Sequence, residues 1–245
     1  MRRPVASARQ CPRLARRDLG RGGYIDYVTQ DNRPAVPETP GQRARYDRVI
    51  AAATEVLIAG GQEAVQMKDL AQRAGVSLAT LYRYFPAKDY VLLAVTLSRY
   101  QAAWRKVSAE EPRGDTVRAR VAAHLLREFR AQQRNQRLTA ALTAALTGGG
   151  RRYSSIIEAA EHTHARIAAH VAAGGGTLSE QQERLLTVVL DIAGAATRRW
   201  LAGTFSVAEV EAQIAIGCQL LELPDDVVDE ELGRVAPDAA STPAS

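Results

Sequence analysis

The chain has 245 residues, of which 46% are hydrophobic and 5% aromatic, and it contains two cysteines. This length allows one large or two small domains with a substantial core. No stretch approaches the roughly 18 uninterrupted apolar residues of a membrane span, and the N-terminus lacks the apolar segment of about 7–15 residues of a secretory signal. Because Cys11 and Cys218 lie far apart, we expect no disulfide framework and a reducing, cytoplasmic environment.

The net charge of +5 is unevenly distributed along the chain. Residues 1–48 hold eleven arginines and five acids, whereas residues 205–245 hold nine acids and one arginine. A basic N-terminal part is typical of a protein that meets an anionic partner, although two solvated tails would give the same pattern. Residues 1–40 show no helical period, so we expect a disordered basic arm there, and a disordered acidic tail over residues 225–245.

The first ordered segment has the layout of a helix-turn-helix. Alanine and leucine dominate the composition and strand-type alternation is nearly absent, so we expect an all-α fold. Apolar spacing predicts a long helix from about Gln42 to Gly60, a short helix over residues 67–74 and another over residues 78–84. A break at Gly75 separates the two short helices, as in a helix-turn-helix.

The second short helix carries an unusual concentration of polar-tipped aromatic residues. Ser77 should cap this helix, and Pro86 should end it. Leu81 and Phe85 lie four residues apart and can share the buried side. The outward side would then present Thr80, Tyr82, Arg83 and Tyr84, whose hydroxyl and guanidinium groups suit the anionic, acceptor-rich major groove of DNA. The alternative is a helical hairpin with incidental surface aromatics.

Between about residues 44 and 90, and most specifically in the run AGVSLATLYRYFPAK, the chain resembles the DNA-binding domain of the TetR family of transcriptional regulators. The resemblance implies a three-helix DNA-binding head over residues 41–88 and a larger helical domain for ligand binding and dimerisation over residues 89–224. A two-fold dimer would place two recognition helices about one turn of DNA apart on a palindromic operator. The implied DNA contacts are Gln66, Lys68, Ser77, Leu78, Ala79, Thr80, Tyr82, Arg83, Tyr84 and Lys88.

Five residues of this head differ in how they could contact DNA. Gln66 stands where many members of the family have serine or threonine, and glutamine is a poorer helix cap. Leu78 and Ala79 cannot hydrogen-bond, so they would read thymine methyl groups or allow close approach. Arg43 and Arg45, at the start of the long helix, could add two phosphate contacts.

Six more helices are predicted after Lys88, and the family resemblance implies that the last two form a four-helix dimer interface. They cover residues 89–108, a stretch through Leu125 and Phe129, the run LTAALTAAL, and residues 152–173, 179–203 and 207–221. The interface would use Leu185, Val188, Val189, Ile192, Ala196, Ile214 and Leu221. Alternatively, the same apolar stripe packs inside one subunit.

A ligand pocket is expected among the middle helices. The candidate residues are Trp104, His124, Phe129, Leu142, Ile156 and Thr163, each of which could equally belong to an ordinary core. A looser likeness over about 190 residues connects the chain to the branch of the family that represses sterol-catabolism genes. That likeness implies a small apolar effector such as a lipid or a sterol-derived CoA thioester.

Enzymatic chemistry finds little support in the sequence. No nucleophile elbow, P-loop or HExxH motif occurs. Glu158, His162, Arg166 and His170 follow at intervals of four, but an arginine in their midst would repel a cation, so we interpret them as a solvated helix face. We therefore expect no metal, no cofactor and no catalytic residue.

The sequence predicts a homodimeric, ligand-responsive DNA-binding regulator, which we expect to be a repressor released from its operator by a small-molecule effector. The alternative is a helical lipid-binding protein or enzyme that retains a regulator-like head. Specific binding to an operator distinguishes the two.

Overall fold

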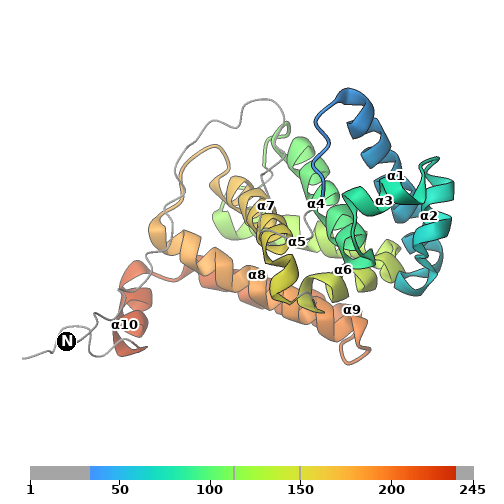
Figure 1. The fold of residues 1–245 in the computed structure, drawn as a ribbon. Coiled ribbons are helices and arrows are strands. Elements are labelled where there is room, and N and C mark those ends of the chain that lie inside the picture. Colours follow the sequence, from blue (N-terminus) through green and yellow to red (C-terminus); the bar gives the residue numbers. More distant parts are fainter. Residues whose placement is uncertain (1–33, 113, 149, 236–245) are drawn as a thin grey trace, which may run out of the picture.

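The computed structural model describes residues 34–235 except residues 113 and 149, and all regular structure in these residues is helical (Figure 1). The expected all-α fold is confirmed. The helices are α1 (Pro40–Gly60), α2 (Met67–Arg73), α3 (Leu78–Tyr84), α4 (Lys88–Val107), α5 (Val117–Arg134), α6 (Gln136–Gly148), α7 (Ser154–Ala173), α8 (Glu180–Leu201), α9 (Val207–Gly217) and α10 (Asp225–Val235). Short 3-10 turns are η1 (Gln62–Ala64), η2 (Arg151–Tyr153) and η3 (Cys218–Glu222).

The head consists of α1, α2 and α3 around a small apolar core. Leu57, Leu70 and Leu81 each come from a different helix and are at most 1% exposed. Gly75, between α2 and α3, has a φ of 62°, a conformation that glycine adopts without strain. Ser77 Oγ accepts a hydrogen bond from the Thr80 amide at 3.1 Å, which confirms the predicted cap of α3. The expected helix-turn-helix is therefore present.

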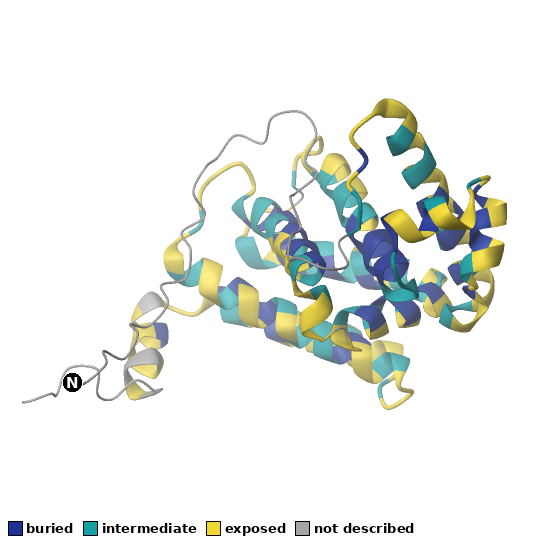
Figure 2. Cartoon of the chain, in the orientation of Figure 1, coloured by how far each residue is buried: buried dark blue, intermediate teal, exposed yellow. Residues whose placement is uncertain are grey.

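Helix α4 joins the head to the body, and most of its first half is buried. Every residue from 90 to 97 is buried, and the Thr96 hydroxyl donates to the Leu92 carbonyl within the helix. This half packs against α1, α6 and α7, so that one continuous core contains Leu81 of α3, Val91 of α4 and Leu138 of α6. Figure 2 shows this core as the dark blue region in the middle of the molecule. The position of the head is thus tied to the position of α4.

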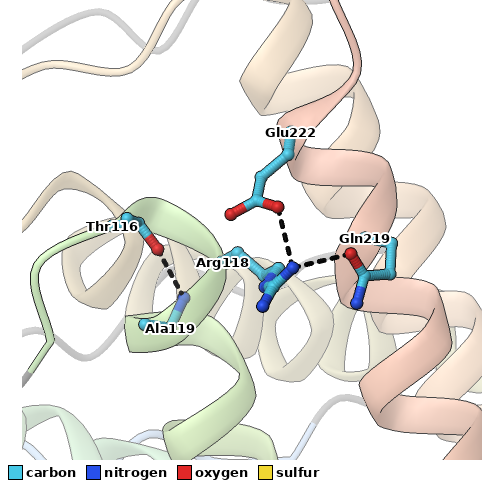
Figure 3. Close-up of polar contacts among 5 residues, drawn as sticks. All are labelled: Thr116, Arg118, Ala119, Gln219 and Glu222. Carbon is cyan, nitrogen blue, oxygen red and sulfur yellow. Dashed lines mark hydrogen bonds and ion pairs between the residues drawn. The ribbon is translucent and has the colours of Figure 1, made fainter.

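A second core lies between α5, α8, α9 and η3. Phe129 and Ile214 are at its centre, with exposed fractions of 1% and 2%. At its edge, Arg118 Nη1 donates to Gln219 Oε1 at 2.7 Å and to Glu222 Oε2 at 2.8 Å (Figure 3). These exposed polar contacts join the start of α5 to η3.

The acidic end of the chain differs from the expectation. Residues 225–235 form helix α10, so the prediction of a disordered tail is wrong for this stretch. Arg234 pairs with Glu230 and Glu231 one turn earlier, and such pairs stabilise an otherwise acidic helix. Residues 236–245, the rest of the expected tail, lie outside the described residues.

The expected basic arm lies mostly outside the described residues, which begin at residue 34. Residues 34–39 form an extended segment against the head rather than a free chain, so the prediction is wrong for this part. The Ala35 amide donates to the Arg83 carbonyl at the end of α3, at 2.9 Å. Thr39 then caps α1 in a reciprocal pair with Gln42.

Arg120 fastens α5 to the C-terminal end of α7. Its Nε and Nη2 both donate to the Ala172 carbonyl, at 3.1 and 2.7 Å, and its Nη1 donates to the Gly114 carbonyl at 3.1 Å. The guanidinium crosses over Gly174, which has a left-handed φ of 57°. A Cβ added at Gly174 would lie 2.5 Å from Arg120 Nε, so this crossing requires glycine.

We expect a Gly174→Ala variant to lose about 1–3 kcal/mol of unfolding free energy, because alanine is strained in the left-handed region and Arg120 must leave the Ala172 carbonyl. Gly203→Ala is the matched control, since Gly203 has a φ of 73° and nothing within 4 Å of an added Cβ. Urea unfolding followed by circular dichroism measures both. Equal losses in the two variants would contradict the role assigned to Arg120.

Candidate DNA-binding face and effector pocket

The outward face of α3 brings together half of the residues predicted to contact DNA. Leu78 and Tyr82 are 41% and 45% exposed, although both are large hydrophobic side chains. A firmly docked helix that presents small and polar-tipped side chains has the size and chemistry to enter the major groove. The other members of this face are Ser77, Ala79 and Arg83, which are exposed, and Thr80, which is half-buried.

Tyr84 does not belong to this face, so the expectation that it points outward is wrong. It is 1% exposed, and its ring packs edge-to-face on Tyr46 with 5.9 Å between centroids. Tyr84 follows Leu81 by three residues, which places both on the buried side of α3. The Tyr84 hydroxyl accepts a hydrogen bond from Arg83 Nη2 at 3.1 Å, and Arg83 Cζ lies 5.0 Å from the ring centroid. The buried tyrosine therefore positions Arg83.

Three predicted contacts flank α3 on neighbouring elements. Lys88, at the start of α4, is half-buried and its Nζ donates to the Gln62 carbonyl at 2.9 Å, which leaves further N–H donors for a phosphate. Gln66 precedes α2 without any capping hydrogen bond from its side chain, as its residue type predicts. Lys68, in the first turn of α2, is exposed.

The start of α1 supplies the remaining basic candidates. Arg43 and Arg45 are both half-buried, and Arg43 Nη2 donates to the Pro37 carbonyl at 3.5 Å. The segment that holds Pro37 also bonds to the end of α3 through Ala35. Sequence reasoning missed this contact, because no local pattern shows that residues 34–39 pack on the recognition helix.

A cavity of about 650 Å³ lies between α4, α5, α6 and α7. Leu138, Leu142 and Ile167 give it an apolar lining, and all three are less than 9% exposed. Of the six residues predicted for a ligand pocket, His124 and Leu142 line this cavity. The structure thus provides a pocket of a size suited to a small molecule.

The other four predicted pocket residues do not line this cavity and make different contacts. Phe129 packs edge-to-face against Trp200 in the second core, with 5.3 Å between centroids. Arg166 lies over the Trp104 ring, 4.0 Å from its centroid. Ile156 belongs to the core around α4, and the Thr163 hydroxyl donates to a carbonyl of its own helix.

Four polar side chains gather inside the cavity around the carboxylate of Glu128. His164 Nε2 lies 3.2 Å from Glu128 Oε2, and His124 Nε2 lies 3.9 Å from the same oxygen. Gln132 Nε2 donates to Glu128 Oε1 at 3.5 Å. The Tyr100 ring stacks on His164 with 4.9 Å between centroids. Helices α4, α5 and α7 therefore meet at one polar cluster within the pocket.

The cluster contains an ion pair and a neutral histidine. Burial alone would raise the pKa of Glu128, but the charge and hydrogen bond of His164 outweigh it, and the pKa lies below its usual value. Burial alone would lower the pKa of His164, but the charge and hydrogen bond of Glu128 raise it above its usual value. Burial lowers the pKa of His124, which therefore favours its neutral form.

The mouth of the cavity is basic. Four exposed cations among the lining residues form what we call the basic rim: Arg99, Lys106, Arg127 and Arg134. A further arginine, Arg130, pairs with Glu211 at 3.5 Å. Sequence reasoning missed the rim, although Arg127 and Arg134 lie seven residues apart and so share one side of α5.

The predicted dimer surface is only partly exposed. Val189, Ala196, Ile214 and Leu221 are at most 5% exposed and form the core between α5, α8, α9 and η3, so the prediction is wrong for these four. Leu185 and Ile192 are half-buried, and Val188 is 46% exposed.

The exposed side of α8 and α9 carries apolar residues that sequence reasoning missed. Ile216 is 65% exposed and Val207 is 42% exposed. Ile214 and Ile216 are two residues apart, so on a helix only one of them can face the core of the subunit. The apolar stripe therefore divides between an internal face and an outer face.

Neither a metal centre nor a membrane span is found in the described part of the chain. Within it, no group of three or more His, Cys, Asp or Glu side chains could hold a metal ion. No helix of that part is long and apolar enough to cross a membrane. Glu158 and His162 are exposed, while His170 packs edge-to-face on Trp104.

Two family models match most of the ordered chain. The model for bacterial regulatory proteins of the tetR family matches residues 49–95, which hold most of the head and the start of α4. The model for the tetracyclin repressor-like C-terminal domain matches residues 114–221, from the start of α5 to η3.

Relatives and solved structures agree with these models. The HTH-type transcriptional repressor KstR of Mycobacterium tuberculosis is 30% identical over 180 residues, which cover 74% of this chain and 81% of KstR. A TetR transcriptional regulator from Rhodococcus sp. RHA1 has a TM-score of 0.66 at 27% identity, over 75% of this chain and 97% of that one. Thermus thermophilus FadR, solved in complex with lauroyl-CoA, shares the fold. Its TM-score is 0.57 at 20% identity, and the match covers 81% of this chain and 99% of FadR.

These matches confirm the resemblance seen in the sequence, including the likeness to the repressor branch typified by KstR. The matched families and relatives are transcriptional regulators and not enzymes. The chain belongs to the TetR family of bacterial transcriptional regulators.

Proposed function

We propose that this protein represses transcription as a two-fold dimer, whose two α3 helices bind a palindromic operator and which an amphipathic anionic effector releases. The observation that carries the proposal is the arrangement of one helix, α4. It begins beside the recognition helix at Lys88, and it lines the effector cavity with Thr96, Arg99 and Tyr100.

Distinct roles on DNA follow from the geometry of α3. Tyr82 and Thr80 offer hydroxyls to phosphates, and Ser77 both caps the helix and lies 2.8 Å from the Thr80 hydroxyl. Arg83 is held by the hydroxyl of the buried Tyr84. Its long side chain and its several N–H donors allow it to hydrogen-bond to the edge of a guanine or to a phosphate. Lys88 adds a backbone contact from the start of α4.

Dimerisation is supported by the outer face of α8 and α9. Val188, Val207 and Ile216 are exposed apolar side chains on these two helices, which pack against each other. A two-fold axis across this face would cover them with their own copies, and it would set two heads on one side of the dimer. Half-site spacing of the operator would follow from that geometry.

The effector is inferred from the two parts of the cavity. Leu138, Leu142 and Ile167 favour an apolar body, while the basic rim favours phosphate groups at the mouth. A CoA thioester of a lipid or sterol-derived acid combines both features. The rival function, a lipid-binding protein with a relic head, is not favoured, because the relatives across most of the chain are repressors.

Release from DNA would follow from the position of α4. An effector can shift the dimer only by its difference in affinity between the DNA-bound and DNA-free conformations. Filling the cavity presses on the α4 residues between Thr96 and Lys106, and the buried first half of α4 carries the head with it. The change in separation of the two α3 helices then weakens operator binding.

We expect Arg83→Ala to weaken binding to the true operator by about 10- to 100-fold, corresponding to the loss of about 1–3 kcal/mol for one base or phosphate contact. Arg105→Ala is the matched control, because Arg105 is exposed on α4 and lies outside the cavity lining. Fluorescence anisotropy with an upstream duplex and a scrambled duplex, at several salt concentrations, measures the effect. Unchanged affinity of Arg83→Ala would refute the assignment of α3 as the recognition helix.

The basic rim generates a second prediction. The double variant Arg127→Gln/Arg134→Gln should bind dodecanoyl-CoA about 10-fold more weakly, since each lost charge-assisted contact to phosphate contributes roughly 0.5–1 kcal/mol at an exposed site. Its affinity for dodecanoate, which lacks the CoA phosphates, should change much less. Isothermal titration calorimetry measures both ligands, and Arg105→Gln serves as the control. Equal weakening for the acid and the thioester would contradict a phosphate-binding rim.

A further inference from the structure

We propose that the arginines of residues 1–33, the basic segment, bind the DNA that flanks each half-site of the operator. Residues 34–39, the anchor, hold this basic segment at the end of the recognition helix. The inference rests on the proposed function of α3 as the recognition helix, and it extends the DNA-binding surface beyond the helix-turn-helix.

The first step is the way the anchor is fixed to the head. The Ala35 amide donates to the Arg83 carbonyl at 2.9 Å, so the anchor is bonded to the last turn of α3. Ala35 also packs against the core that contains the head. Pro37, in the middle of the anchor, is buried, and Thr39 at its other end caps α1. The anchor is thus attached to the head along its whole length.

The second step is the place where the basic segment joins the head. Pro34 is the first residue that the structure describes, and it directly precedes Ala35. Because consecutive Cα atoms are about 3.8 Å apart, the residue before Pro34 is tethered beside the C-terminal end of α3. That end of α3 carries the exposed side chains of Tyr82 and Arg83. The covalent chain therefore delivers the basic segment to the edge of the surface that binds the operator.

The third step is the charge that is delivered there. Residues 1–33 hold eight arginines, three aspartates and no lysine or glutamate. Duplex DNA carries one negative charge per about 1.7 Å of its axis, and each cation that neutralises a phosphate releases a counterion. Arginine is well shaped for this contact, because its planar guanidinium can bind two phosphate oxygens at once. An arginine-rich segment tethered beside DNA therefore favours its phosphates.

The length of the basic segment allows these contacts. An extended chain advances about 3.3 Å per residue, so about ten residues span one turn of DNA, roughly 34 Å. Arg33 directly precedes the anchor, and Arg21 lies about a dozen residues before it. Both arginines can therefore reach phosphates within about one turn of the half-site.

The acidic end of the chain is the other anionic group that could bind the basic segment. Residues 205–245 hold nine acids and one arginine. In Figure 1, however, α10 lies at the opposite end of the molecule from α1, α2 and α3. Two of its acids, Glu230 and Glu231, already pair with Arg234 of the same helix. The position of the anchor favours DNA over this acidic end.

The test compares two duplexes that contain one operator, selected from a pool of random duplexes. The short duplex ends at the outer edges of the two half-sites, and the long duplex continues for about one turn on each side. Fluorescence anisotropy with the full-length protein, at several salt concentrations, gives both affinities. We expect the wild-type protein to bind the long duplex about 10-fold more tightly at about 0.1 M salt, because only this duplex contains the flanking phosphates.

Variants then locate the contribution. Arg21→Gln/Arg33→Gln removes two cations per subunit, so the slope of log K against log salt on the long duplex should become shallower by about 2–4, at about 0.9 per lost phosphate contact. Its affinity for the short duplex should change by less than about twofold. Arg105→Gln/Arg184→Gln is the matched control, since it removes the same charge from exposed positions on α4 and α8, and it should keep the wild-type slope.

Two results would overturn the inference. One is that the wild-type protein binds the short and the long duplex equally tightly at every salt concentration. The other is that Arg21→Gln/Arg33→Gln keeps the wild-type salt slope and the preference for the long duplex, as it would if the basic segment paired with the acidic end of the chain.

The short duplex keeps failure of this inference distinct from failure of the proposed function. If the protein prefers the short operator to a scrambled duplex of equal length but gains nothing from the flanks, recognition by α3 stands and the role of the basic segment falls. If the selection yields no operator, the repressor model falls. The salt slopes of the wild type and of Arg21→Gln/Arg33→Gln on a long scrambled duplex then decide whether the basic segment binds DNA, and equal slopes refute it.

Discussion

The burial of the first half of α4 is the constraint on which the rest of the structure depends. Residues 90–97 leave no side open to solvent, because α1, α6 and α7 surround them. The head therefore shares its core with the body, and α3 is oriented by the same contacts that position α4. Because close-packed interiors transmit strain, we propose that a change beside the second half of α4 reaches the recognition helix.

The second important feature is the cluster of polar side chains around Glu128 inside the cavity. The Glu128–His164 ion pair links α5 to α7, and Tyr100 of α4 stacks on the same histidine. Such a buried network is favourable only when its members are satisfied, and the buried atoms His124 Nε2 and Gln132 Oε1 have no hydrogen-bond partner among the described residues.

The sequence predicted the head more fully than the body, for physical reasons. Capping by Ser77, the break at Gly75 and the spacing of Leu81 and Phe85 are local signals, and all of them correspond to the structure. The phenol of Tyr84 suggests a surface position, whereas its place three residues after Leu81 puts it on the buried side of α3. The body depends on contacts between distant helices, which no local period encodes. Thus the apolar pattern alone does not show that Val189 and Ile214 belong to an internal core, nor that α4 and α5 together form the basic rim.

The most direct test of the central claim, that the cavity controls the separation of the heads through α4, is a distance measurement between the two heads. A spin label at Gln72→Cys, exposed on α2, reports this distance by double electron–electron resonance in a Cys11→Ser background. Cys218 should remain unlabelled, because it is buried and burial raises the pKa of its thiol to about 11. The account predicts that a bound acyl-CoA thioester shifts the distance between the labels and that operator DNA shifts it the opposite way. An identical distance distribution with ligand, with DNA and with neither would contradict it.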